Sequence, residues 1–99
     1  MFMAHRLLHR RLAQASSRLK ELRTELVVVE DQMSHVVDEA DDKAMRALVS
    51  ETPSADFEYR DAKRHADAMK RNHQKIVSEI ADLERKINEL LDRMKESRT

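Results

Sequence analysis

The chain has 99 residues, of which 38% are charged and 3% aromatic, and its 19 basic residues balance its 19 acidic ones. This composition is typical of long, solvated helices, and a net charge of zero excludes an overall attraction to nucleic acid or membrane surfaces. The absence of cysteine excludes disulfides, thiolate metal sites and cysteine nucleophiles.

The N-terminal segment does not have the order of a secretory signal, because its charged residues lie among and after the apolar ones. The longest uninterrupted apolar run, from Leu26 to Val29, is far too short to cross a bilayer. We therefore expect a cytoplasmic protein without a transmembrane segment, built as a single domain over residues 1–99.

Small or apolar residues recur at steps of three and four through the first half of the chain. The members of this seam are Leu8, Leu12, Ala15, Leu19, Leu22, Leu26, Val29, Met33, Val36 and Ala40. Such spacing keeps one stripe of a helix facing a partner helix, and the segment is rich in good helix formers and free of glycine and proline. The pattern predicts a first helix over about residues 3–49.

The only stop and start signals in the chain lie within residues 50–54. Thr52 can cap a new helix through its hydroxyl, and Pro53 suits the first helical position, where a missing N–H costs nothing. We expect a turn at about residues 50–53 and a second helix over about residues 53–96.

The same spacing returns in the second half of the chain. This second seam consists of Ala62, Ala66, Met69, His73, Ile76, Ile80, Leu83, Ile87, Leu90 and Met94. A hairpin about Pro53 sets opposite each other residues whose numbers add to about 105, so the two seams face each other throughout. Residues 24–42 carry seven acids and no lysine or arginine, whereas residues 60–75 carry six bases and two acids. Spacing and charge together predict an all-α, antiparallel coiled-coil hairpin.

Several apolar residues lie outside both seams. Four of them gather near the turn and are named here the turn patch: Met45, Leu48, Val49 and Phe57. A two-helix hairpin has no enclosed interior, so we expect two hairpins to form a four-helix bundle. We interpret the chain as a non-enzymatic interaction or scaffold protein that binds itself and a protein partner, the latter through the turn patch.

His73 is the one polar residue in either seam. A polar residue at such a position usually fixes the register and the number of helices at some cost in stability. We interpret His73 in this way; a buried switch or a ligand is the alternative.

The first 23 residues contain six bases and one acid. They form a basic amphipathic start, in which Arg6, Arg10 and Arg11 could bind anionic lipid or the backbone of a nucleic acid. We favour instead a pairing of this basic start with acids of the returning helix, namely Glu84, Glu89, Asp92 and Glu96.

No catalytic or cofactor motif occurs in the chain: it has no His-Glu-x-x-His, no glycine-rich phosphate loop and no nucleophile elbow. Asp38 and Asp42 share a helical face and could approach His65 across the hairpin, which is the only candidate oxygen and nitrogen metal site. We expect neither a metal, nor a cofactor, nor an enzymatic activity.

An acidic element in the first helix has the pattern acid, two residues, aspartate, one residue, alanine, at Glu39, Asp42 and Ala44. It resembles the acidic coiled-coil element of bacterial RNA-polymerase secondary-channel factors, whose hairpin presents acids near the catalytic magnesium. The resemblance implies an alternative function as a transcription regulator that binds RNA polymerase. Two features depart from that pattern: the acids lie well before the predicted tip, and no cysteines could form a zinc module.

Overall fold

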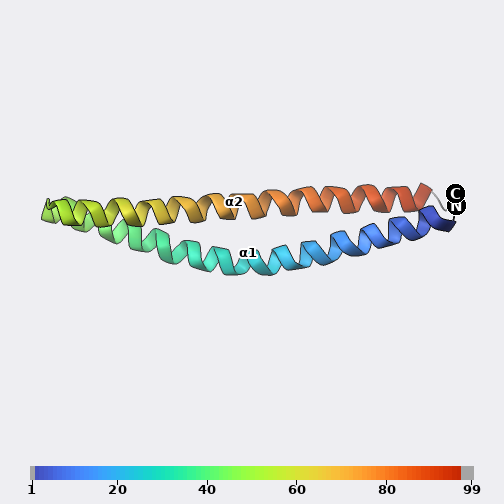
Figure 1. Ribbon diagram of the computed structural model, residues 1–99, viewed down its shortest axis with the longest axis horizontal. Helices are drawn as coiled ribbons and strands as arrows, with labels where there is room; N and C mark the ends of the chain where they lie inside the picture. The colour runs from blue at the N-terminus through green and yellow to red at the C-terminus, as the bar shows by residue number, and fades with distance from the viewer. Residues whose placement is uncertain (1, 97–99) are drawn as a thin grey trace. The chain divides into compact units, whose positions relative to one another are not determined.

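The structure, a computed structural model that describes residues 2–96, contains two long helices there and no strand (Figure 1). Helix α1 comprises Phe2–Ser50 and helix α2 comprises Pro53–Glu96. Glu51 and Thr52 alone connect them. The predicted all-α, antiparallel helical hairpin is confirmed.

The chain packs as two compact units, each with a piece of both helices. One unit combines the start of α1, through Glu25, with the part of α2 that begins at Ile76; the other comprises Leu26–Lys75, including the turn. We call them the terminal unit and the turn unit. Within each unit the α1 and α2 segments run in opposite directions beside each other.

The two predicted seams supply the core of both units. Every seam residue is buried or half-buried, and all apolar residues that are buried among the described ones belong to a seam. They are Ala15, Leu19, Leu22, Val29, Ala40, Ala62, Ala66, Ile76, Leu90 and Met94. Leu22 is the most buried, with 1% of its surface exposed. The four-three spacing therefore identifies the residues whose burial holds the helices together.

Small side chains form the core of the turn unit. Ala40, Ala62 and Ala66 make one buried cluster, against which Val36 and Val37 pack. Because a methyl group takes little room, the backbones can approach closely here, and each residue buries less apolar area than a leucine would.

Two adjacent residues, Glu51 and Thr52, form the turn: the first ends α1 and the second begins α2. Glu51 has a left-handed backbone (φ 51°), and its N–H donates to the carbonyl oxygen of Ala47 at 3.2 Å, which terminates α1. Thr52 begins α2, because its Oγ1 accepts a hydrogen bond from the N–H of Ala55 at 3.2 Å and its carbonyl accepts one from Asp56 at 3.1 Å. The predicted capping role of Thr52 is thus confirmed.

Glycine at position 51 is expected to stabilise the hairpin. A residue with a Cβ atom is strained in the left-handed region, so Glu51→Gly should raise the free energy of unfolding by about 0.5–1 kcal/mol. Urea unfolding followed by helical circular dichroism measures the gain. Glu51→Ala is the matched control, since it removes the carboxylate but keeps Cβ. An equal gain in both variants would assign the effect to the negative charge at the end of α1 instead.

Candidate interaction surfaces

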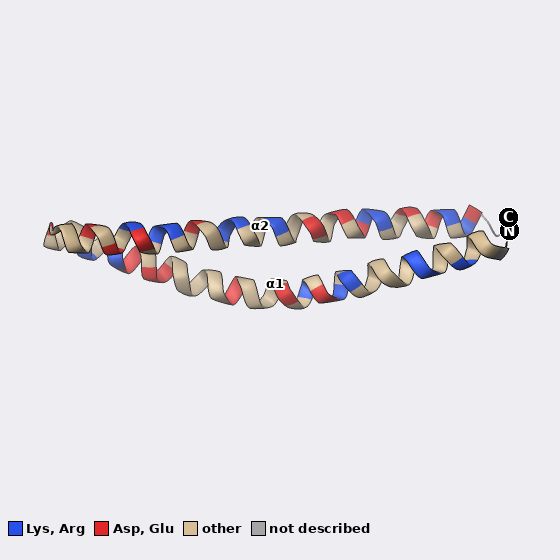
Figure 2. Ribbon diagram, in the orientation of Figure 1, with Lys and Arg blue, Asp and Glu red and all other residues tan. Residues whose placement is uncertain are grey.

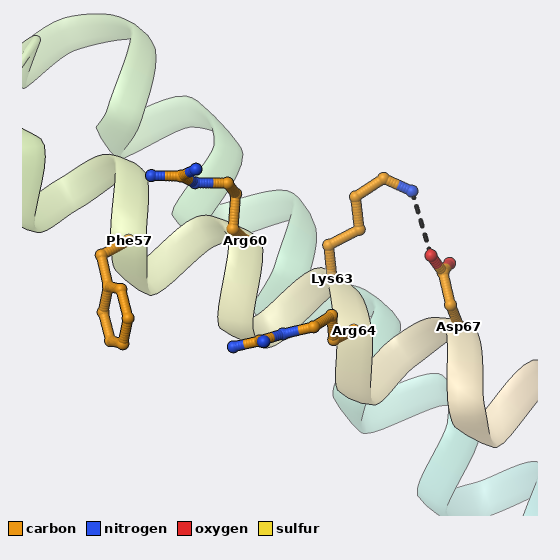
Figure 3. A pocket seen from close by; sticks show the side chains of 5 residues that line it. All are labelled: Phe57, Arg60, Lys63, Arg64 and Asp67. Carbon is orange, nitrogen blue, oxygen red and sulfur yellow. Dashed lines mark hydrogen bonds and ion pairs between the residues drawn. The ribbon is translucent and has the colours of Figure 1, made fainter.

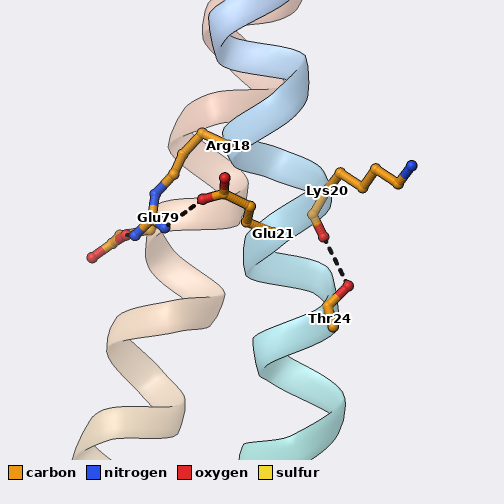
Figure 4. Close-up of polar contacts among 5 residues, drawn as sticks. All are labelled: Arg18, Lys20, Glu21, Thr24 and Glu79. Atoms are coloured by element: carbon orange, nitrogen blue, oxygen red, sulfur yellow. Dashed lines mark hydrogen bonds and ion pairs between the residues drawn. The ribbon is translucent and has the colours of Figure 1, made fainter.

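The basic start of α1 reaches acids of α2 within the terminal unit (Figure 4). Arg18 lies between two carboxylates, with Nη1 3.3 Å from Glu21 and Nη2 3.5 Å from Glu79. Arg23 Nη2 is 3.6 Å from Glu84, one of the acids expected as partners. All these side chains are substantially exposed, so each pair contributes at most about 1 kcal/mol.

The first three turns of α1 present exposed cations. Arg6, Arg10 and Arg11 all lie on the surface. The expected pairing is confirmed for Arg23 with Glu84, whereas Arg18 pairs with Glu79, an acid of α2 that was not among those expected. Neither Arg10 nor Arg11 forms an ion pair with any residue that the structure describes. Their binding to a polyanion stays a prediction.

His73 lies half-buried between the helices of the turn unit. Its side chain is 26% exposed, and Nε2 is 3.7 Å from Oε1 of Glu30 on α1. That distance is too long for a hydrogen bond, and the contact is an ion pair only when the imidazole is protonated. A polar ring therefore occupies a seam position without a hydrogen-bonding partner there.

The acidic segment of α1 carries several carboxylates with no ion-pair partner. Glu39 pairs with Lys43 at 3.4 Å. The acids Asp38, Asp41 and Asp42 are exposed and form no ion pair among the described residues. The two acids of the acidic element therefore differ: Glu39 forms an ion pair with a lysine on its own helix, whereas Asp42 forms none with a described residue.

The candidate metal set does not come together. His65 Nε2 lies 3.8 Å from Oδ2 of Asp61 on its own helix. Within residues 2–96, no three or more histidine, aspartate and glutamate side chains converge as a metal site would require.

Half of the six bases in the basic segment of α2, residues 60–75, pair with acids on their own helix. Arg60 pairs with Asp56 at 2.8 Å, Lys63 with Asp67 at 3.2 Å and Arg64 with Asp61 at 3.0 Å. Residues three or four apart on one helix are close neighbours, which explains why these bases pair locally rather than with α1. Three further bases, Lys70, Arg71 and Lys75, are exposed and have no ion-pair partner in the described part of the chain.

A shallow groove of about 130 Å³ runs between the helices of the turn unit. We call it the alanine groove, because Ala40, Ala44 and Ala66 are its small members. Its other lining residues are Val37, Asp41, Tyr59, Lys63, Asp67 and Lys70. The groove thus combines small apolar side chains with charged ones, and two of these, Asp41 on α1 and Lys70 on α2, form no ion pair with any described residue.

The turn patch consists of two parts. Met45, Leu48 and Val49 are 64%, 73% and 82% exposed and share one face of α1, since they are three and four residues apart. Phe57 is 62% exposed on α2, where it lines an open depression with Arg60, Lys63, Arg64 and Asp67 (Figure 3). None of the three α1 residues lines that depression. The sequence therefore identified four exposed apolar residues, but it did not show that the depression beside Phe57 excludes the other three.

Neither described helix is long and apolar enough to cross a membrane. No family model matches the chain, and neither the curated proteins nor the solved structures contain a match. A function for this chain is therefore inferred from its residues and their surroundings.

Proposed function

We propose that the protein is a self-associating helical hairpin that serves as an interaction or scaffold protein and binds a protein partner through the turn patch. The observation that carries this proposal is the exposure of Met45, Leu48 and Val49 on one face of α1. Three adjacent aliphatic side chains on one face form a larger apolar surface than scattered single residues do, and such surfaces are typical of interaction sites.

The small amount of buried surface supports self-association. The chain exposes 7812 Å², whereas a compact monomer of 11.6 kDa would expose about 5,800 Å². Among the described side chains only Leu22 is less than 2% exposed. A second copy that covers part of this surface would add apolar burial at about 25 cal/mol per Å².

Sedimentation equilibrium at micromolar concentration tests the proposal. The unmodified chain should be a dimer, and Leu48→Glu should weaken the association at least tenfold, because Leu48 lies one helical turn beyond Ala44 on the groove side of α1 and a carboxylate there would be buried by a second copy. Leu7→Glu is the matched control, since Leu7 is an exposed leucine in the terminal unit and its replacement should leave the dimer unchanged. A fully helical monomer at every concentration would overturn self-association.

A further inference from the structure

The two helices of the turn unit carry segments of opposite net charge (Figure 2). The α1 segment 26–42 contains six acids and no lysine or arginine, whereas the α2 segment 60–75 has a net charge of +4. Within these two segments the acids that pair with no described residue are Asp38, Asp41 and Asp42 on α1, and the bases that pair with none are Lys70, Arg71 and Lys75 on α2. In one hairpin, α1 therefore presents negative charge and α2 presents positive charge to another molecule.

A surface of this kind complements a second copy of itself. In a two-fold dimer each contact occurs twice, so a face with an acidic and a basic half can match its own copy when the halves are exchanged. A partner of one charge sign would be attracted by one helix and repelled by the other.

Two hairpins can stack face to face about a two-fold axis in two ways. An axis parallel to the helices puts α1 of one copy on α2 of its partner, with both turns at the same end. An axis perpendicular to the helices and in the plane between the hairpins puts α1 on α1 and α2 on α2, with the turns at opposite ends. The first arrangement brings the acidic segment against the basic one, whereas the second brings like charges together, which is unfavourable.

The parallel axis also keeps every residue at its own level along the helices. A residue of α1 then lies at the same height along the helices as its facing residue in the partner's α2. The two residue numbers add to about 105, as they do within one hairpin. The 26–42 segment thus meets the basic segment of the partner's α2. The alanine groove fits this contact, because its small residues permit close approach and it presents Asp41 and Lys70 at its surface.

We infer that two copies stack through the alanine-groove face of the turn unit with their turns at the same end, each α1 lying on the partner's α2. This inference rests on the proposed self-association and specifies its geometry. It also brings the turn patches of both copies to one end of the dimer, where a protein partner would meet both.

Pulsed electron paramagnetic resonance on a spin label at Ser54→Cys tests the arrangement. The chain has no cysteine, so this label is unique, and position 54 is exposed in the first turn of α2. With both turns at one end the two labels should be less than about 25 Å apart, since neighbouring helices pack at about 10 Å. Turns at opposite ends would separate them by about 40 Å or more, at about 1.5 Å per residue from the middle of the turn unit. The longer distance would overturn the arrangement while leaving self-association intact.

Charge reversal supplies an independent readout. Replacing the three α1 acids with lysine changes the charge of segment 26–42 from −6 to 0, and replacing the three α2 bases with glutamate changes that of segment 60–75 from +4 to −2. Each change removes the attraction between the two segments, so each should weaken dimerisation at least tenfold. Circular dichroism on each variant confirms that helicity is retained. In the arrangement with α1 on α1, either change alone would reduce the like-charge repulsion and would therefore not weaken the dimer. Absence of any dimer in the unmodified chain would instead overturn the proposed function itself.

Discussion

Replacement of Leu22 by alanine is expected to lower the free energy of unfolding by about 3 kcal/mol, because a buried leucine that becomes alanine loses transfer free energy and leaves a cavity. Leu22 is 1% exposed, and no other described side chain is as buried. A hairpin whose core is a single seam has little stability in reserve, so a loss of this size is a large part of the total. Urea unfolding monitored at 222 nm should show the midpoint falling sharply, down to partial unfolding in buffer alone.

Leu7→Ala is the control for this experiment. Leu7 lies in the same unit and on the same helix but is 45% exposed, and the substitution changes helix propensity by the same amount. Its cost should be within about 1 kcal/mol, since much of the leucine surface already contacts water. Equal losses from both positions would contradict the view that the seam carries the stability.

Replacement of His73 by leucine is expected to have the opposite sign. The imidazole is half-buried in the seam, and its Nε2 is 3.7 Å from Glu30, which is beyond hydrogen-bond reach. Leucine at this position would bury more apolar surface and remove a partly buried polar ring, so the variant should gain about 1–2 kcal/mol of unfolding free energy. For a domain of about this size the melting temperature should rise by about 4–8 °C for each kcal/mol.

His65→Leu is the matched control, because the His65 side chain is 72% exposed and the same chemical change there should give no comparable rise. A lower melting temperature in the His73 variant would mean that the contact with Glu30 stabilises the fold. Sedimentation of both variants also tests the register interpretation, since loss of a polar seam residue can change the number of associated helices.

The core of this fold was predictable from the sequence. A four-three repeat is set by helix geometry, so membership of the seam follows from spacing alone, and all its predicted members are buried or half-buried. The start of α2 was also predictable, because Thr52 followed by Pro53 is typical of a helix N-terminus.

The surface was less predictable, for identifiable physical reasons. The end of α1 carries no glycine or asparagine, so nothing in the sequence marked Glu51 as left-handed. Exposed ion pairs contribute little energy, so local side-chain geometry decides which residues pair. Arg18 pairs with Glu79 across the helices, whereas Arg60 and Arg64 pair with acids on their own helix. Opposed charge blocks revealed which segments lie beside each other but not which atoms pair.

The junction of Thr52 and Pro53 has a consequence for how copies of this chain can exchange parts. Two long helices joined by two residues would be expected to undergo domain swapping, in which α1 and α2 become one continuous helix and pair with a second chain through the same seam. Inside such a helix Pro53 would lack a backbone donor, and its ring would clash with the carbonyl of Val49, at a cost of about 3 kcal/mol per chain. The residue that begins α2 therefore also disfavours the swapped dimer, and association is left to the outer faces of the closed hairpin.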